Sequence, residues 1–135
     1  MICVDTTFLV DLWREKDLAL SPAKRILVDH AGEDFAVPAH AAGEFLEGGA
    51  AVSEERLAQS LHFLRLFRVG DVGIETARRY ALIVAGMRAA STLAGKSRPD
   101  LWIAAWALEH NAPLVTSNVR HFADVPDLRL LGYST

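Results

Sequence analysis

Three short runs of mostly apolar residues constrain the fold of this chain more than any other feature of its sequence. They cover residues 1–4, 35–39 and 113–116, and none of them alternates regularly between apolar and polar side chains. Unbroken runs of this length are typical of strands that are buried on both faces, as in a parallel sheet. Helical patterns separate the runs, so the sequence predicts an α/β fold with a parallel sheet.

The segments between these runs predict helices with different degrees of burial. The expected helices cover residues 8–14, 22–31, 40–47, 53–67, 73–90 and 99–110, and residues 68–69 and 128–131 add two possible short strands. Gly48-Gly49 is expected to end the third helix. The last helix is apolar nearly all round and should be buried, with Trp102 and Trp106 stacked one turn apart. A stripe from Leu57 to Phe67 suits either the core or a dimer surface.

Length and composition indicate an ordinary globular protein. With 135 residues, 51% of them hydrophobic, the chain is expected to form a single domain over residues 1–135. The lone cysteine, Cys3, and the lack of a long apolar segment favour a cytoplasmic protein without a membrane span. The formal net charge of −3 lacks the overall basic character of many nucleic-acid-binding proteins, although a locally basic rim remains compatible with it.

Three acids stand where the predicted strands and helices meet. Asp5 directly follows the first apolar run, Glu44 lies one turn into the helix after the second, and Asp100 opens the buried helix. Thr116 and Asn118 leave the third run. Because parallel strands end at one edge of a sheet, all five side chains are expected to gather at that edge.

Such a cluster predicts a metal site. Carboxylates from separate segments repel one another unless a cation lies between them, and oxygen-only ligands select Mg²⁺ or Mn²⁺ over Zn²⁺. No two histidines have the spacing of a zinc site on one helix. A magnesium centre at a sheet edge indicates metal-assisted hydrolysis of a phosphodiester, with Asp5, Glu44 and Asp100 as ligands and Thr116 and Asn118 assisting.

Four of these residues also have a purely structural interpretation, whereas Asp5 is the hardest to explain in that way, because a carboxylate directly after an apolar strand is seldom structural. Glu44 and Asp100 could serve only as acids near helix N-termini, and Thr116 and Asn118 could form only a turn. Asp11 and Glu47 are expected to be solvated. The basic residues near the predicted edge could line a phosphate path or be ordinary surface charge; they are Arg14, Lys96, Arg98 and Arg120.

Taken together, four motifs resemble the PIN-domain ribonucleases, and among them the VapC-type toxins of bacterial toxin–antitoxin pairs. The motifs are Val4-Asp5-Thr6-Thr7, Glu44 after a strand, the segment Asp100-Leu-Trp-Ile-Ala-Ala-Trp-Ala, and Leu114-Val-Thr-Ser-Asn-Val-Arg-His-Phe122. They follow the order and spacing of that family over essentially the whole chain.

The resemblance implies a three-layer α/β/α fold with a mainly parallel central sheet. It implies Mg²⁺- or Mn²⁺-dependent RNA cleavage, a homodimer, and a VapB-like antitoxin whose C-terminal tail covers the site. Asp5, Glu44 and Asp100 match the metal-holding acids of the family, and Thr7 and Thr116 match its hydroxyls. Asn118 stands where many members have a fourth acid, so one ion or two could be bound.

Two other functions remain open from the sequence. A module that binds RNA or a partner without cleaving is compatible with Asn118, because an amide adds no charge to the site. A magnesium-dependent phosphotransfer domain would also use a strand-end aspartate, but Thr7 stands where phosphohydrolases of that kind need a second aspartate. Neither the RNA target nor the antitoxin can be read from the residues.

Overall fold

The computed structural model describes residues 1–134, whose strands form one sheet in the order β3–β2–β1–β4–β5. The strands are β1 (Ile2–Val4), β2 (Phe35–Pro38), β3 (Arg68–Gly70), β4 (Leu114–Thr116) and β5 (Leu130–Gly132). The helices are α1 (Thr6–Arg14), α2 (Pro22–Asp29), α3 (Ala39–Val52), α4 (Glu54–Phe63), α5 (Ile74–Ala89), α6 (Arg98–Glu109) and α7 (Val119–Phe122), with a 3₁₀ turn η1 (Leu64–Leu66). Every strand pair is parallel, which confirms the predicted fold class.

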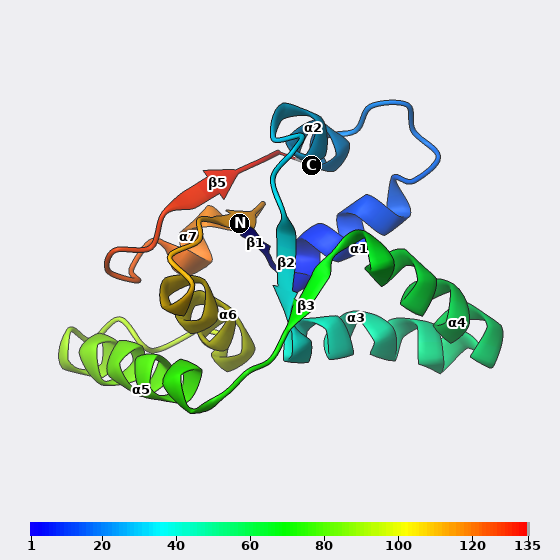
Figure 1. The fold of residues 1–135 in the computed structure, drawn as a ribbon. Coiled ribbons are helices and arrows are strands. Elements are labelled where there is room, and N and C mark those ends of the chain that lie inside the picture. Colours follow the sequence, from blue (N-terminus) through cyan, green and yellow to red (C-terminus); the bar gives the residue numbers. More distant parts are fainter. Residues whose placement is uncertain (135) are drawn as a thin grey trace.

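The helices form two layers around the sheet (Figure 1). In that view α1, α3 and α4 lie on one side of the strands, and α5, α6 and α7 lie on the other. Helix α6 supplies the largest share of buried positions; they are Leu101, Ile103, Ala104, Ala105, Trp106 and Ala107. The prediction of a helix buried nearly all round is therefore confirmed, and the three-layer α/β/α arrangement follows.

The central strand β1 and its neighbour β4 are fully buried. Each residue of β1 and of β4 is buried, whereas β3 and β5 form the partly exposed edges. A strand that is covered by helices on both faces has no face exposed to water, which explains why its sequence is an unbroken apolar run. Because all strands are parallel, the chain segments after β1, β2 and β4 leave the sheet at the same edge.

The prediction that Gly48-Gly49 ends a helix is wrong, because α3 continues to Val52. Gly49 instead allows the close approach of α4. A Cβ at Gly49 would lie 2.5 Å from the Ser60 hydroxyl oxygen and 3.1 Å from the carbonyl oxygen of Arg56. The missing side chain thus lets two helices pack together, and the turn comes later, at Ser53, whose side chain accepts from the Arg56 N–H at 3.0 Å.

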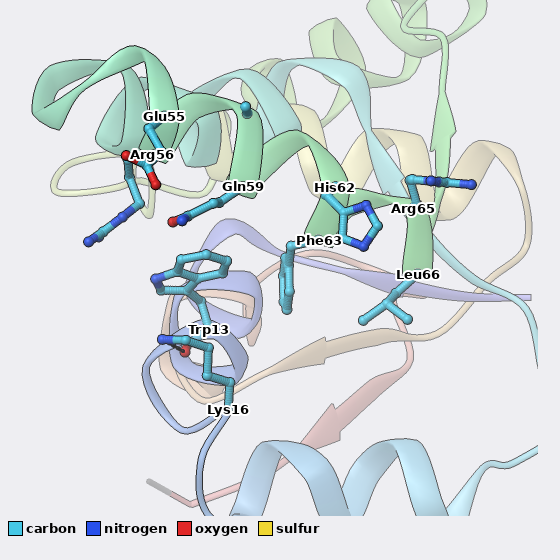
Figure 2. Close-up of a pocket in the computed structure, with 10 residues that line it drawn as sticks. Trp13, Lys16, Glu55, Arg56, Gln59, His62, Phe63, Arg65 and Leu66 are labelled. Atoms are coloured by element: carbon cyan, nitrogen blue, oxygen red, sulfur yellow. Dashed lines mark hydrogen bonds between the residues drawn. The ribbon is translucent and has the colours of Figure 1, made fainter.

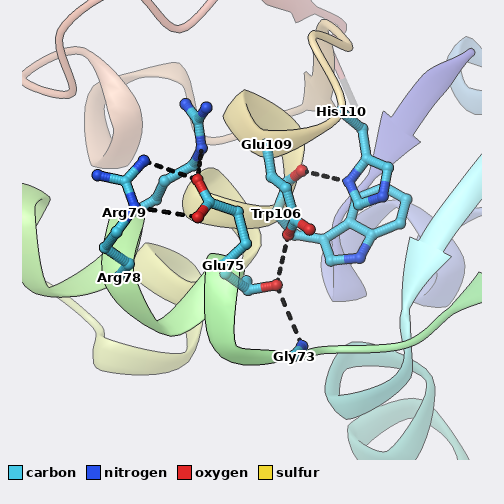
Figure 3. A network of polar contacts seen from close by, with 8 residues as sticks. Gly73, Glu75, Arg78, Arg79, Trp106, Glu109 and His110 are labelled. Atoms are coloured by element: carbon cyan, nitrogen blue, oxygen red, sulfur yellow. Dashed lines mark hydrogen bonds and ion pairs between the residues drawn. The ribbon is translucent and has the colours of Figure 1, made fainter.

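A polar network ties α5 to the end of α6 (Figure 3). The Thr76 hydroxyl, which is fully buried, donates to a Glu109 carboxylate oxygen at 2.5 Å and accepts from the Gly73 N–H at 3.2 Å. The Trp106 indole N–H donates to the Asp71 carbonyl at 3.0 Å. These bonds satisfy polar groups that packing of the two helices removes from water.

Trp102 and Trp106 do not stack on each other as expected. Trp102 stacks on Tyr80 of α5, with ring centroids 4.3 Å apart and an interplanar angle of 12°. Trp106 stacks on His110 at 3.9 Å and 26°. Because α5 packs along α6, Tyr80 lies within stacking distance of Trp102.

The apolar stripe from Leu57 to Phe67 divides between core and surface. Leu64 and Phe67 are buried, while Leu61 keeps 51% of its surface exposed. The change of phase comes at Phe63, where α4 gives way to the 3₁₀ turn. No helix within residues 1–134 is both long and apolar enough to cross a bilayer.

Candidate active site

Asp5 is the most deeply buried acid at the edge where the parallel strands end. It directly follows β1 and is 2% exposed. Its side chain caps α1, since carboxylate oxygen Oδ1 accepts from the Phe8 N–H at 2.8 Å. Aspartate is among the preferred residues at a helix N-cap, so the sequence both turns the chain and fixes this carboxylate in one orientation.

The surroundings of Asp5 disfavour its charge. Burial is the main cause that raises its pKa to about 6, and the charges of Asp100 and Asp11 add to the effect. Hydrogen bonds from the Phe8 N–H and the Thr116 side chain act in the opposite direction. A carboxylate that is desolvated and faces further acids is a typical feature of functional sites.

Thr116 comes from the end of β4, the strand beside β1, and is fully buried. Its hydroxyl oxygen accepts from the Asn118 N–H at 2.9 Å. That bond leaves the hydroxyl proton free for the Asp5 carboxylate. Asn118 therefore supports the site through its backbone, and its side chain makes no capping bond to α7.

Asp100 lies in the first turn of α6 and approaches the same edge from another layer. Its carboxylate is 28% exposed and lies 3.7 Å from Nδ1 of His121. Burial raises the pKa of Asp100, while the neighbouring His121, the Ser97 hydroxyl and His40 act against that rise. The Ser97 side chain caps α6 by accepting from the Asp100 N–H at 3.3 Å.

Glu44 stands at the rim of the site. It is exposed and lies in the second turn of α3, where its Oε1 accepts from the Thr6 hydroxyl at 3.2 Å. Thr6 is the residue after Asp5, so this bond ties Glu44 to the start of α1. We define the acid edge as Asp5, Asp100, Thr116 and Glu44 with the segments that hold them.

The structure brings the predicted residues to one edge without forming a tight cluster of three acids. Within residues 1–134, no three side chains of the types His, Cys, Asp and Glu gather closely enough to hold one ion by themselves. Asp5 and Asp100 are coupled through their charges, and Glu44 joins them through Thr6. Asp5 and Asp100 are thus the two carboxylates at the centre of the site. The roles of all five predicted residues stay predictions; they are Asp5, Glu44, Asp100, Thr116 and Asn118.

Sequence reasoning missed a second contact to this region. Asp11 was expected to be solvated, but it is only partly exposed, and its Oδ2 accepts from the Tyr133 hydroxyl at 2.7 Å. The Tyr133 ring also packs edge-on against Phe8 at 5.5 Å. The position of Asp11 on the helix that follows Asp5 was the one sequence signal for this contact. Its partner Tyr133 lies 122 residues away, so the hydrogen bond itself could not be predicted.

The basic residues near the acid edge have different surroundings. Lys96 binds Asp124 at 2.8 Å, and Arg98 donates to the Tyr80 hydroxyl at 3.1 Å. Arg14 and Arg120 are exposed. Arg98 lines a hollow together with Glu44, a residue of the acid edge.

A separate hollow of about 1000 Å³ lies between the end of α1 and α4 (Figure 2). We call it the α1–α4 groove; it is lined by Trp13, Lys16, Glu55, Arg56, Ala58, Gln59, His62, Phe63, Arg65 and Leu66. Trp13 and Phe63 meet edge to face at 5.4 Å, and Lys16 lies 4.6 Å from the centre of the Trp13 ring. Three cations and one carboxylate surround this aromatic floor, so the groove is apolar with a basic rim.

The chain thus combines a parallel α/β/α fold with two carboxylates at one edge of the sheet, Asp5 after β1 and Asp100 in the first turn of α6. The chain belongs to the PIN domain family, whose model matches residues 2–128. No curated protein matches the chain.

Solved structures of toxin–antitoxin complexes share the fold. VapBC2 from Rickettsia felis, bound to a promoter DNA fragment, has a TM-score of 0.84 at 22% identity, over 99% of this chain and 100% of that chain. VapBC from Salmonella typhimurium, also DNA-bound, reaches 0.84 at 20% identity over 98% of each. VapC20 from Mycobacterium tuberculosis, described as a sarcin-ricin loop cleaving toxin, reaches 0.63 at 17% over 87% and 88%.

Proposed function

We propose that this protein is a Mg²⁺- or Mn²⁺-dependent endoribonuclease and the toxin of a type II toxin–antitoxin pair. The observation that carries the proposal is the buried carboxylate of Asp5, which ends the central strand and is coupled to Asp100. Membership of the PIN domain family supports a nuclease, and the VapC20 toxin, which cleaves the sarcin-ricin loop, supports RNA as the substrate.

The donors at the acid edge fit a hard divalent cation. Asp5, Asp100 and Glu44 offer only oxygen atoms, and Mg²⁺ is typically bound by one or two carboxylates while it keeps several waters. Burial is the main cause of the raised pKa of Asp5, and a cation between Asp5 and Asp100 would offset the repulsion that adds to it. When bound, the ion would acidify a water and neutralise phosphate charge during attack.

The residues of the chain have separate tasks in this proposal. Asp5 is held by the Phe8 N–H and Thr116, and a pKa of about 6 leaves its carboxylate mostly ionised at neutral pH. Asp100, in the first turn of α6, would help to hold the ion. Glu44 is exposed and anchored by Thr6, so it can orient the attacking water and accept its proton.

We also propose a VapB-like antitoxin as the partner and the α1–α4 groove as its docking surface. The complexes from Rickettsia felis and Salmonella typhimurium support a partner of this kind. The groove has an aromatic floor, and its rim carries three cations, Lys16, Arg56 and Arg65, and one carboxylate, Glu55. It therefore fits an amphipathic segment that carries an apolar anchor and acidic side chains. A homodimer, implied by the family resemblance, is testable by light scattering.

The test of the nuclease compares Asp5→Asn with Glu47→Gln in the full-length chain. Asparagine can still cap α1 but cannot supply the charge, so we expect Mn²⁺-dependent RNA cleavage to fall by at least about 100-fold. Glu47 is an exposed acid one turn from Glu44, and its replacement should leave the rate unchanged. Circular dichroism checks the fold of both variants.

Two results would count against the proposal. Equal cleavage by Asp5→Asn and the wild type would remove Asp5 from the active site. A wild-type chain that binds RNA yet leaves it intact with either cation would favour the binding module instead.

A further inference from the structure

A smaller hollow, of about 440 Å³, adjoins the acid edge between the start of α3 and the start of α6. It is lined by His40, Glu44, Val72, Arg98, Pro99 and Trp102. Glu44 belongs to both the hollow and the acid edge, and Pro99 directly precedes Asp100. A group seated here would therefore lie next to the proposed cleavage centre.

The wall of this hollow contains a tryptophan whose orientation is fixed. Trp102 stacks on Tyr80 at 4.3 Å with nearly parallel rings, and Arg98 donates to the Tyr80 hydroxyl at 3.1 Å. Tyr80 does not line the hollow, so its stack supports the indole from outside. Val72 and Pro99 add apolar surface beside the indole. A flat aromatic surface that is already ordered loses little entropy when a ligand stacks on it.

Polar groups surround this apolar wall. His40 lies with Nε2 3.2 Å from the Pro99 carbonyl oxygen, which fixes its ring between the two helix starts. Arg98 contributes a cation and Glu44 a carboxylate. A flat apolar wall with donors and acceptors at its rim matches the chemistry of a nucleobase, which has apolar faces and a polar edge.

We propose that this hollow binds one unpaired nucleobase of the RNA, next to the phosphate that is cleaved, with Trp102 as its stacking partner. The inference rests on the proposed ribonuclease function and deepens it, because it names unpaired RNA as the substrate and a residue that selects it. The α1–α4 groove offers a larger and more basic surface for a protein partner, which leaves this hollow for the substrate.

The test uses Trp102→Ala, Trp102→Phe and, as a control, Leu82→Ala on the exposed face of α5. Each full-length variant cleaves a labelled single-stranded RNA, and the same RNA is prepared with an abasic nucleotide on either side of the cut. We expect Trp102→Ala to lower kcat/KM roughly tenfold, mainly through KM, and to weaken the base preference at one flanking position. Trp102→Phe should keep most of the wild-type kcat/KM and most of its base preference, and Leu82→Ala should match the wild type.

The abasic RNA separates stacking from a loss of folding. On RNA with one abasic position, the wild type should lose about as much kcat/KM as Trp102→Ala loses on intact RNA. Trp102→Ala acting on that abasic RNA should lose no more than either change alone causes. Should Trp102→Ala fail to fold, Trp102→Phe and the abasic substrates with the wild type provide the same comparison.

Three outcomes would overturn the proposal. The first is normal cleavage of RNA by Trp102→Ala with an unchanged preference, which leaves the ribonuclease intact but removes the base pocket. The second is a Trp102→Ala variant that loses antitoxin affinity instead, which assigns the hollow to a protein. The third is a wild type that cleaves no RNA, which ends the ribonuclease proposal and this one with it.

Discussion

The acid edge and the α1–α4 groove are built in opposite ways. The central acid of the first is almost fully buried, follows a strand directly and is oriented by a backbone N–H. The second is formed by side chains of helix surfaces, with Trp13 partly exposed and its cations in water. The backbone of the sheet thus fixes the position of the chemistry, whereas the groove is shaped by helix side chains, of which Trp13 and Phe63 also pack against the hydrophobic core.

Helix α1 connects the two regions. Asp5 caps its start, and Trp13 lies near its end. At a rise of 1.5 Å per residue, the eight-residue separation of Asp5 and Trp13 corresponds to roughly 12 Å. A partner anchored at Trp13 therefore needs only a short extension to reach the acids, so one segment could bind at the groove and cover the site.

The largest expected effect separates binding from cleavage. Trp13→Ala removes the aromatic floor of the groove, and loss of such an anchor costs roughly 2–4 kcal/mol, or about 30- to 1000-fold in affinity. We expect antitoxin affinity to fall by this much while RNA cleavage stays within about twofold. Isothermal titration with the antitoxin and a cleavage assay measure the two quantities on the same preparation.

Asp5→Asn provides the opposite case. It should retain antitoxin binding at the groove while cleavage is lost. Loss of both activities in Trp13→Ala, with a native circular dichroism spectrum, would show that the two regions are not independent and would contradict the comparison.

The second prediction concerns stability and pH in the presence of a chelator. Burial raises the pKa of Asp5 from 3.8 to about 6, so between these values the folded chain holds a proton that the unfolded chain has lost. The free energy of unfolding should therefore fall as pH rises from about 4 to 6. A rise of about two pKa units corresponds to on the order of 3 kcal/mol, because each unit is worth about 1.4 kcal/mol.

Denaturant unfolding at pH 4.5 and pH 7.5 measures this change. Asp5→Asn should lack the Asp5 contribution and be more stable than the wild type at pH 7.5, since it keeps the cap without the buried charge. Trp13→Ala, in the exposed groove, should keep the pH dependence of the wild type. An equal dependence in Asp5→Asn and the wild type would contradict the desolvation of Asp5.

The fold and the positions of the acids could be predicted because they follow from local patterns. Unbroken apolar runs indicated the buried strands β1, β2 and β4, and parallel strands must end at one edge. That rule alone brought Asp5 and Thr116 together. The α1–α4 groove has no comparable pattern, because its lining comes from residues whose spacing on α4 is also that of an ordinary surface helix.

Contacts between distant segments were the part that the sequence did not reveal. The bond from Tyr133 to Asp11 joins the two ends of the chain, and the stack of Trp102 on Tyr80 depends on how α5 crosses α6. Gly49 misled the prediction for a related reason. A glycine pair signals a helix end when only local conformation matters, but here it makes room for a neighbouring helix.

The smallest expected effect sharpens the description of the acid edge itself. Asn118 lies two residues after Thr116, whose side chain bonds to Asp5. The Asn118 side chain does not cap α7, so Asn118→Asp would add a charge without removing a capping hydrogen bond. We expect Mn²⁺ affinity, measured by titration calorimetry, to rise about three- to tenfold because a further carboxylate strengthens binding of a hard cation. Asn111→Asp makes the same chemical change before β4, at the opposite edge, and should have no effect. Equal affinities in both variants would place residue 118 outside the reach of the ion and leave Asp5 and Asp100 as its principal ligands.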